Sequence, residues 1–155
     1  MPTSDRPVLH HKDQVTVKAA PQKVWDTIKG FDSIHTWYPA AESTVLLVGE
    51  NGKPLAVREF QTMDGGFVIS ELLEYDEAKM WFKYRILKTN APLRGYVGEM
   101  QVVSAEDGHS VVIWSAEFHR PDEVPKPGQD DLATTEIVKG IFKAGLENLP
   151  GTISG

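Results

Sequence analysis

Short segments with the residue pattern of β-strands fill most of the chain between residues 14 and 119, and turn residues separate them. Apolar and polar residues alternate in these segments, which is typical of strands with one buried face. Asn51-Gly52, Asp64-Gly65-Gly66 and Asp107-Gly108 are strong signals for tight turns. Strands joined by such short connections pair antiparallel. The seven predicted strands are Gln14–Ala19, Thr44–Val48, Leu55–Thr62, Phe67–Tyr75, Met80–Leu87, Tyr96–Ser104 and Ser110–His119.

One long helical pattern follows the strands. Asp130 favours a helix N-terminus, and we expect Pro150-Gly151 to end the helix, which gives Asp130–Leu149. Two shorter helices are expected after the first strand, one from Pro21 to Gly30 and one over residues 32–36. The apolar residues at helical spacing in the long helix are Ile137, Val138, Ile141, Phe142, Leu146 and Leu149.

The order of these elements predicts an α+β fold. We expect a curved, seven-stranded antiparallel sheet wrapped around the long C-terminal helix, with two short helices after the first strand. At 155 residues the chain is long enough to bury one core. The predicted organisation is a loose N-terminal segment over residues 1–12, one domain over 13–149 and a C-terminal tail over 150–155.

Charge and apolar content exclude several classes of function. The formal net charge of −6 disfavours binding to nucleic acid, which requires a basic surface. No apolar run has the length of a membrane span, and the first twenty residues lack the apolar core of a secretion signal. We therefore expect a cytoplasmic protein without membrane insertion or a nucleic-acid partner, present as a monomer or a homodimer.

The residues that bind metals and cofactors are sparse. The chain has no cysteine, and none of its five histidines shows the i, i+4 spacing of a helical zinc site. No glycine-rich phosphate loop is present. The sequence therefore predicts neither a metal site nor a cofactor.

Aromatic residues dominate one face of the fifth to seventh predicted strands. Either they form a solid core against the helix or they line a cavity, and buried tyrosine and tryptophan need partners that a ligand can supply. The residues sharing this face are Met80, Phe82, Tyr84 and Ile86, then Tyr96, Gly98, Met100 and Val102, then Val112, Trp114, Ala116 and Phe118.

Glu71 and two glycines also bear on this choice. Counting by twos places Glu71 on one face with Phe67, Ile69 and Leu73, but Leu72 and Leu73 are both apolar, so the spacing leaves an inward or a solvent-facing carboxylate open. Gly140 and Gly145 lie inside the long helix at a cost of about 1 kcal/mol each relative to alanine. Close packing or space for a ligand would explain them.

An ordered set of motifs resembles the START-like, or SRPBCC, helix-grip superfamily. It comprises Val15-x-Val17-x-x-Ala20-Pro21-x-x-Val24-Trp25-Asp26, Val57-Arg58, Glu71-x-Leu73, Tyr84-Arg85-Ile86, Gly95-Tyr96, Val112-x-Trp114-x-x-x-Phe118 and the closing pattern from Ile137 to Leu149. The set is most similar to the bacterial polyketide cyclase/dehydrase-like branch, whose fold also resembles plant abscisic-acid receptors.

The resemblance implies an apolar cavity between the sheet and the C-terminal helix, with Glu71 facing inward. The pocket positions it implies are Tyr38, Arg58, Phe60, Glu71, Tyr84, Ile86, Tyr96, Gly98, Ile137 and Ile141, to which the aromatic face adds Met100, Trp114 and Phe118. Relatives often have Pro-Leu-Pro before the Tyr96 strand, whereas this chain has Pro92-Leu93-Arg94. Whether the loop from Lys88 to Arg94 gates a cavity is therefore open.

The sequence is compatible with three functions. The first is binding of a small, largely apolar molecule in the cavity. The second is a cyclase or lyase acting on a polyketide-like substrate, with Glu71 as acid or base and Arg58 polarising a carbonyl. The third is a protein-interaction module whose interior is filled by side chains. We expect the first.

Overall fold

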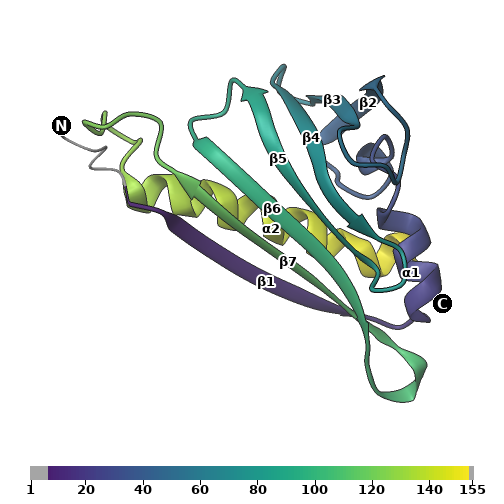
Figure 1. The fold of residues 1–155 in the computed structure, drawn as a ribbon. Helices are drawn as coiled ribbons and strands as arrows, with labels where there is room; N and C mark the ends of the chain where they lie inside the picture. Colours follow the sequence, from purple (N-terminus) through teal and green to yellow (C-terminus); the bar gives the residue numbers. More distant parts are fainter. Residues whose placement is uncertain (1–6, 154–155) are drawn as a thin grey trace.

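Seven antiparallel strands form one open sheet that curves around a long helix. The computed structural model describes residues 7–153 (Figure 1). The strand order is β1-β7-β6-β5-β4-β3-β2. The strands are β1 (Leu9–Val17), β2 (Ala41–Val48), β3 (Val57–Thr62), β4 (Phe67–Asp76), β5 (Trp81–Thr89), β6 (Arg94–Ser104) and β7 (Ser110–His119). This confirms the predicted α+β, helix-grip fold with its seven-stranded sheet.

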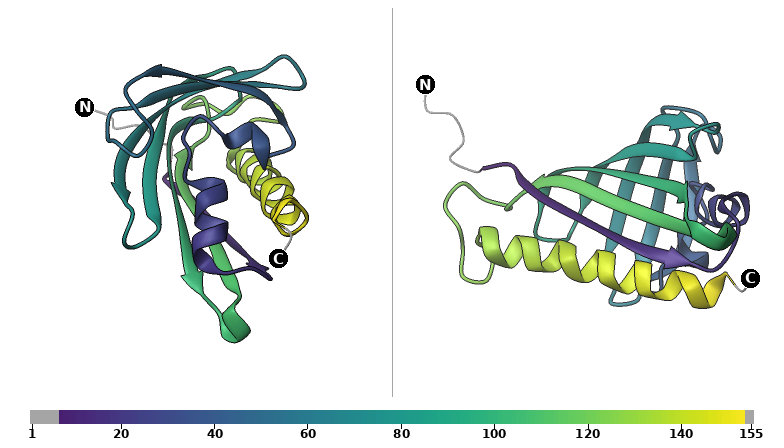
Figure 2. Two further views of the ribbon diagram at one scale, coloured as in Figure 1. Left: turned by 90° about the vertical axis from the view of Figure 1, so that its right-hand side faces the viewer. Right: turned by 90° about the horizontal axis from the view of Figure 1, so that it is seen from below.

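The helices cover the concave face of the sheet. Helix α2 (Asp131–Thr152) runs along this face beside β1, while the sheet bends around it (Figure 2). Helix α1 (Pro21–Ile28) and the 3-10 helix η1 (Ile34–Thr36) follow β1 as predicted, and a further 3-10 turn, η2 (Glu106–Gly108), joins β6 to β7.

Both predicted terminal boundaries are wrong by a few residues. The first strand begins at Leu9, because residues 9–13 pair with β7 in register, from Leu9 opposite Phe118 to Asp13 opposite Trp114. Part of the segment predicted to be loose over 1–12 is therefore strand, and residues 1–6 lie outside the described residues.

The long helix continues through Pro150 instead of ending before it. Proline lacks the N–H that an interior helical residue donates, so the Leu146 carbonyl loses its helical donor, but only two further residues of the helix follow Pro150. The backbone N–H of Ile153 still donates to the Leu149 carbonyl over 2.9 Å, and buried Ile153 holds the end of the helix against the core. Residues 150–152 of the predicted tail therefore belong to the helix.

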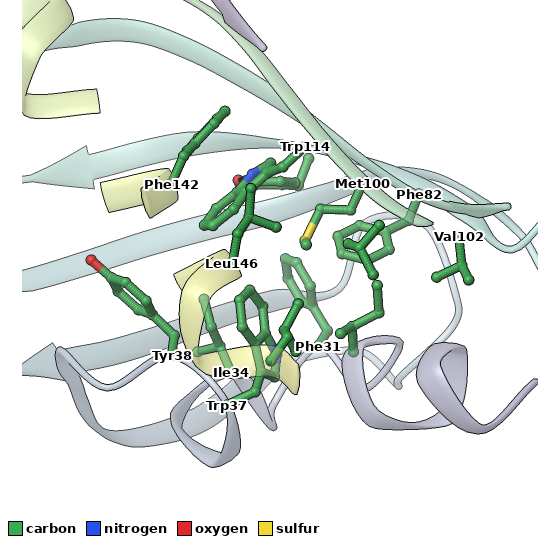
Figure 3. Close-up of a cluster of buried hydrophobic side chains, with 14 of the residues drawn as sticks. Phe31, Ile34, Trp37, Tyr38, Phe82, Met100, Val102, Trp114, Phe142 and Leu146 are labelled. Carbon is green, nitrogen blue, oxygen red and sulfur yellow. Dashed lines mark hydrogen bonds between the residues drawn. The ribbon is translucent and has the colours of Figure 1, made fainter. Parts of the chain in front are cut away.

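The interior between sheet and helix is densely packed over part of its length. We call this region the packed part of the interior, and it comprises Trp25, Phe31, Trp37, Phe82, Met100, Val102, Phe142 and Leu146, all buried. Figure 3 shows most of these side chains gathered between α2, the sheet and the short helices. Phe142 of α2 stacks on Trp114 of β7, with ring centroids 4.2 Å apart and planes inclined by 12°.

Two close approaches explain two of the interior glycines. A Cβ on Gly145 would lie 3.0 Å from the Trp114 ring and 3.1 Å from the Trp37 ring, so the glycine lets α2 pack directly on these aromatics. A Cβ on Gly98 would lie 2.6 Å from the Tyr84 ring, so Gly98 makes room for that side chain. A Cβ on Gly140 would meet no atom of another element within 4 Å, and the structure gives no packing reason for this glycine.

Candidate functional site

Beyond the packed part, the sheet and helix α2 border a cavity of about 580 Å³ that is partly open to solvent. Its wall on the helix side is formed by Ile137 and Ile141, and its wall on the sheet side comes from the inner faces of β3 to β7. The loops after β3 and β5 contribute Asp64 and Asn90, respectively, to its rim. Figure 3 shows Tyr38 with its hydroxyl directed away from the other labelled side chains.

Most residues predicted to contact a ligand lie on this wall. Alternation along β5, β6 and β7 places the even-numbered side chains inward, as the sequence pattern indicated. The predicted residues that line the cavity are Tyr38, Arg58, Phe60, Tyr84, Ile86, Tyr96, Trp114, Ile137 and Ile141.

Glu71 does not face the cavity, which corrects the sequence-based placement. Its β4 neighbours Ser70 and Leu72 are buried on the inner face, so Glu71 projects from the outer one. There it pairs with Arg85 on the neighbouring strand β5, with Glu71 Oε1 2.8 Å from Arg85 Nη2. The carboxylate is satisfied on the outer face, far from the position that an acid or base for a bound substrate needs.

Gly98, Met100 and Phe118 share the inward face but do not line the cavity. Met100 belongs to the packed part, and Gly98 is covered by the Tyr84 ring. Phe118 is completely buried and stacks behind Tyr96, with ring centroids 6.5 Å apart. These three residues support the wall from behind, which corrects their prediction as ligand contacts.

The rim and the β4 side of the cavity were missed by sequence reasoning. An inward-facing Glu71, as the resemblance implied, is incompatible with an inward-facing Ser70 beside it, and the hairpin turns carry no chemical motif. The missed lining residues nearest the rim are Thr62, Met63, Asp64, Gly66, Asn90 and Pro92. The turn signal at Asp64-Gly65-Gly66 located the loop but did not indicate that it borders a cavity.

Three aromatic side chains on the wall form a hydrogen-bonded chain. The indole N–H of Trp114 donates to the Tyr84 hydroxyl over 3.0 Å, and the hydroxyls of Tyr84 and Tyr96 are 2.9 Å apart. Burial raises the pKa of Tyr84 and raises that of Tyr96 well above its ordinary value. Both phenols therefore remain protonated, and available as donors, at neutral pH.

Arg58 brings a buried cation to the same wall. It lies on the inner face of β3, is 4% exposed and donates from Nη1 to the Phe31 carbonyl over 3.0 Å. Its guanidinium carbon is 4.2 Å from the Phe31 ring centroid and 5.5 Å from that of Tyr84. Burial lowers the pKa of Arg58 to about 10, so the side chain is still charged at neutral pH.

Tyr38 and Asp64 also line the cavity. Burial raises the pKa of Tyr38 to about 12. Hydrogen bonds from Thr62 and from the backbone of Gly66 lower the pKa of Asp64, which holds its carboxylate in the β3–β4 turn. The cavity thus combines an aromatic and aliphatic lining with a few polar groups, the arrangement typical of sites for small organic molecules.

The described part of the chain contains neither a cluster of metal-binding side chains nor a helix that could span a membrane. Within residues 7–153 no three histidine, aspartate or glutamate side chains gather closely enough to hold a metal ion. Over the same residues, neither helix has both the length and the apolar character that crossing a membrane requires.

Comparison with known proteins identifies similar sequences and folds. Residues 9–153 match a family described as polyketide cyclase / dehydrase and lipid transport. The solved structure of the protein XoxI from Bacillus cereus is 25% identical, with a TM-score of 0.82 over 93% of this chain and 94% of that one. An uncharacterised protein from Bacillus thuringiensis is 24% identical, with a TM-score of 0.83 over 95% and 100%. No curated protein matches the chain.

Proposed function

The chain belongs to the family of polyketide cyclase / dehydrase and lipid transport proteins, and from this premise we propose that it binds a small, largely apolar molecule in the cavity. The observation that carries the proposal is the cavity itself, about 580 Å³ of space beside a densely packed core. Protein interiors rarely leave unfilled volume of this size, and pockets for small organic molecules fall in the same range.

The chemistry of the wall supports an apolar, partly aromatic ligand. Phe60, Tyr84 and Tyr96 present ring surfaces from the sheet, while Ile137 and Ile141 face them from α2. A ligand between these surfaces would gain about 25 cal/mol for each Å² of apolar surface removed from water. The volume argues against the alternative of an interaction module with a filled interior.

The enzyme alternative lacks the residue on which it depended. Glu71 is engaged with Arg85 on the outer face, so it has no direct path to a substrate in the cavity. The proposal therefore concerns binding, and it assigns no catalytic step to Glu71.

The test is a fluorescence titration with 1-aminoanthracene, an uncharged aromatic probe whose emission rises in apolar surroundings. The parent protein should bind the probe saturably at one site. Ile137→Trp should fill the cavity from the helix side and weaken binding at least tenfold. Lys143→Trp places the same side chain on the exposed face of α2 and should leave the affinity unchanged.

Either of two results would overturn the proposal. If the parent shows no saturable binding, or if Ile137→Trp and Lys143→Trp bind the probe alike, the cavity does not hold apolar ligands. Thermal melts of each variant serve as the control for folding, and a bound probe should raise the midpoint of the parent.

A further inference from the structure

The inner wall of the cavity contains more hydrogen-bond donors than acceptors. A guanidinium carries five N–H groups, and among the described residues only the Phe31 carbonyl accepts from Arg58. The Arg58 Nε group is buried without a partner, and Arg58 forms no ion pair with any described carboxylate. A buried charge without a counter-charge is costly, so a site that retains one needs a reason for it.

The hydrogen-bonded chain beside Arg58 also has one donor left over. Trp114 donates to the Tyr84 oxygen, and one of the two phenol hydrogens lies between Tyr84 and Tyr96. Whichever tyrosine donates in that pair, the other O–H hydrogen has no acceptor among the described residues. Both phenols line the cavity, so the free hydrogen is available to a ligand.

Ser70 completes the polar patch on this wall. It lies directly opposite Arg58 in the β3–β4 register, and both residues line the cavity. Its hydroxyl is fully buried and has no hydrogen-bond partner. We refer to Arg58, Ser70, Tyr84 and Tyr96 together as the donor patch.

No protein carboxylate supplies the missing acceptor. Asp64 is the one acidic residue among those that line the cavity, and hydrogen bonds from Thr62 and Gly66 hold it in the turn. Glu71, one residue from Ser70 along β4, points to the opposite face and pairs with Arg85. The donor patch therefore carries a positive charge that the described chain leaves uncompensated.

We infer that the natural ligand is an apolar carboxylic acid, whose carboxylate binds Arg58 and the free phenol hydrogen while its apolar body lies against Ile137 and Ile141. A carboxylate supplies two acceptor oxygens and the missing negative charge in one planar group, which suits a guanidinium. Charge-assisted hydrogen bonds to such buried groups are stronger than neutral ones. The inference rests on the proposed function and specifies the ligand class for the same cavity.

A matched pair of ligands tests this inference separately from the proposed function. 2-Naphthylacetic acid and 2-naphthylacetamide have nearly the same shape, but only the acid is ionised at pH 7. Isothermal titration should show that the parent binds the acid at least tenfold more tightly than the amide. In Arg58→Met the ratio of the two affinities should fall to about one.

Arg85→Met is the matched control, because it removes an arginine from the outer face of the same sheet. Its side chain is 51% exposed and paired with Glu71, so the parent's preference for the acid should persist. Should Arg58→Met fail to fold, Arg58→Gln provides a second variant. It keeps a polar side chain at this position but removes the charge, and it should reduce the preference for the acid at least threefold.

Each outcome bears on one of the two proposals. An amide that binds the parent as tightly as the acid overturns the carboxylate inference and leaves the proposed function standing. If 1-aminoanthracene, the amide and the acid all fail to bind, the proposed function falls and the inference falls with it. Loss of the preference in Arg85→Met as well as in Arg58→Met also overturns the inference, because the effect is then not specific to the cavity.

Discussion

Helix α2 lies over two very different interiors. Phe142 and Leu146 are buried in the packed part, where aromatic rings interlock around them. Ile137 and Ile141, nearer the start of the helix, are half-buried and face the cavity. The same helix thus holds the fold together along one stretch and forms a binding wall along another.

The difference indicates that some residues of α2 stabilise the fold while others form the wall of the binding cavity. In the packed part the large side chains are buried against one another, so truncation leaves a void. At the cavity the space is already present, so truncation removes one surface of an existing hollow. Substitutions along one helix should therefore separate folding from binding.

The largest expected effect is that of Phe142→Ala. Removing a fully buried ring that stacks on Trp114 should lower the free energy of unfolding by about 3–5 kcal/mol. Ile141→Ala, the adjacent residue at the cavity, should lower it by about 1 kcal/mol or less. Urea denaturation of both variants measures the difference, and equal losses would show that the two interiors are packed alike.

Leucine at the two helix glycines should have opposite effects on stability. Gly145→Leu pushes a side chain into the Trp114 and Trp37 rings and should cost about 1–3 kcal/mol. A Cβ at Gly140 has open space around it, so Gly140→Leu should gain about 0.5–1 kcal/mol from helix propensity. The comparison is contradicted if Gly145→Leu is as stable as the parent in chemical denaturation.

The smallest expected effect is a change in alkaline stability, to which the cavity tyrosines contribute. Three of the four tyrosines, Tyr38, Tyr84 and Tyr96, line it. An unfolded tyrosine ionises near pH 10, whereas burial raises the pKa of folded Tyr38 to about 12. The stability that protonated Tyr38 contributes is therefore complete below pH 10 and is lost as the pH rises toward 12.

Tyr38→Phe removes this ionisation. The fall in the free energy of unfolding between pH 9 and pH 11 should be smaller in the variant than in the parent, as measured by denaturation at both values. An unchanged or steeper fall would place the alkaline sensitivity elsewhere in the chain.

Periodicity predicted the fold and the inward faces of β5 to β7, where alternation placed Tyr84, Tyr96 and Trp114 on one side of the sheet. Helical spacing gave the apolar face of the long helix, and only the resemblance singled out Ile137 and Ile141 on it as pocket positions. In β4 both faces carry apolar residues, and the pairing with β5 shifts between Ile69 and Ser70 and again between Leu72 and Glu74. Counting by twos has no unique answer across such irregularities.

The donor patch could not be predicted from sequence for a different reason. Arg58 was recognised as a wall residue only through the resemblance, and its lack of a counter-charge is a property of three-dimensional neighbours. The resemblance implied an inward-facing Glu71 in the same pocket, but one residue along a strand reverses the face on which a side chain lies. The Glu71 carboxylate instead forms an ion pair with Arg85 on the outer face.

The pairing of β1 with β7 has a consequence for the order of events during synthesis. Leu9 of β1 lies opposite Phe118 of β7, so the first strand to leave the ribosome has no partner until the last strand has followed it. Contacts between such distant parts of a chain form slowly, commonly in milliseconds to seconds. Helix α2, which packs beside β1, emerges later still. The strand made first is therefore the last to be secured, and completion of the sheet waits for nearly the whole chain.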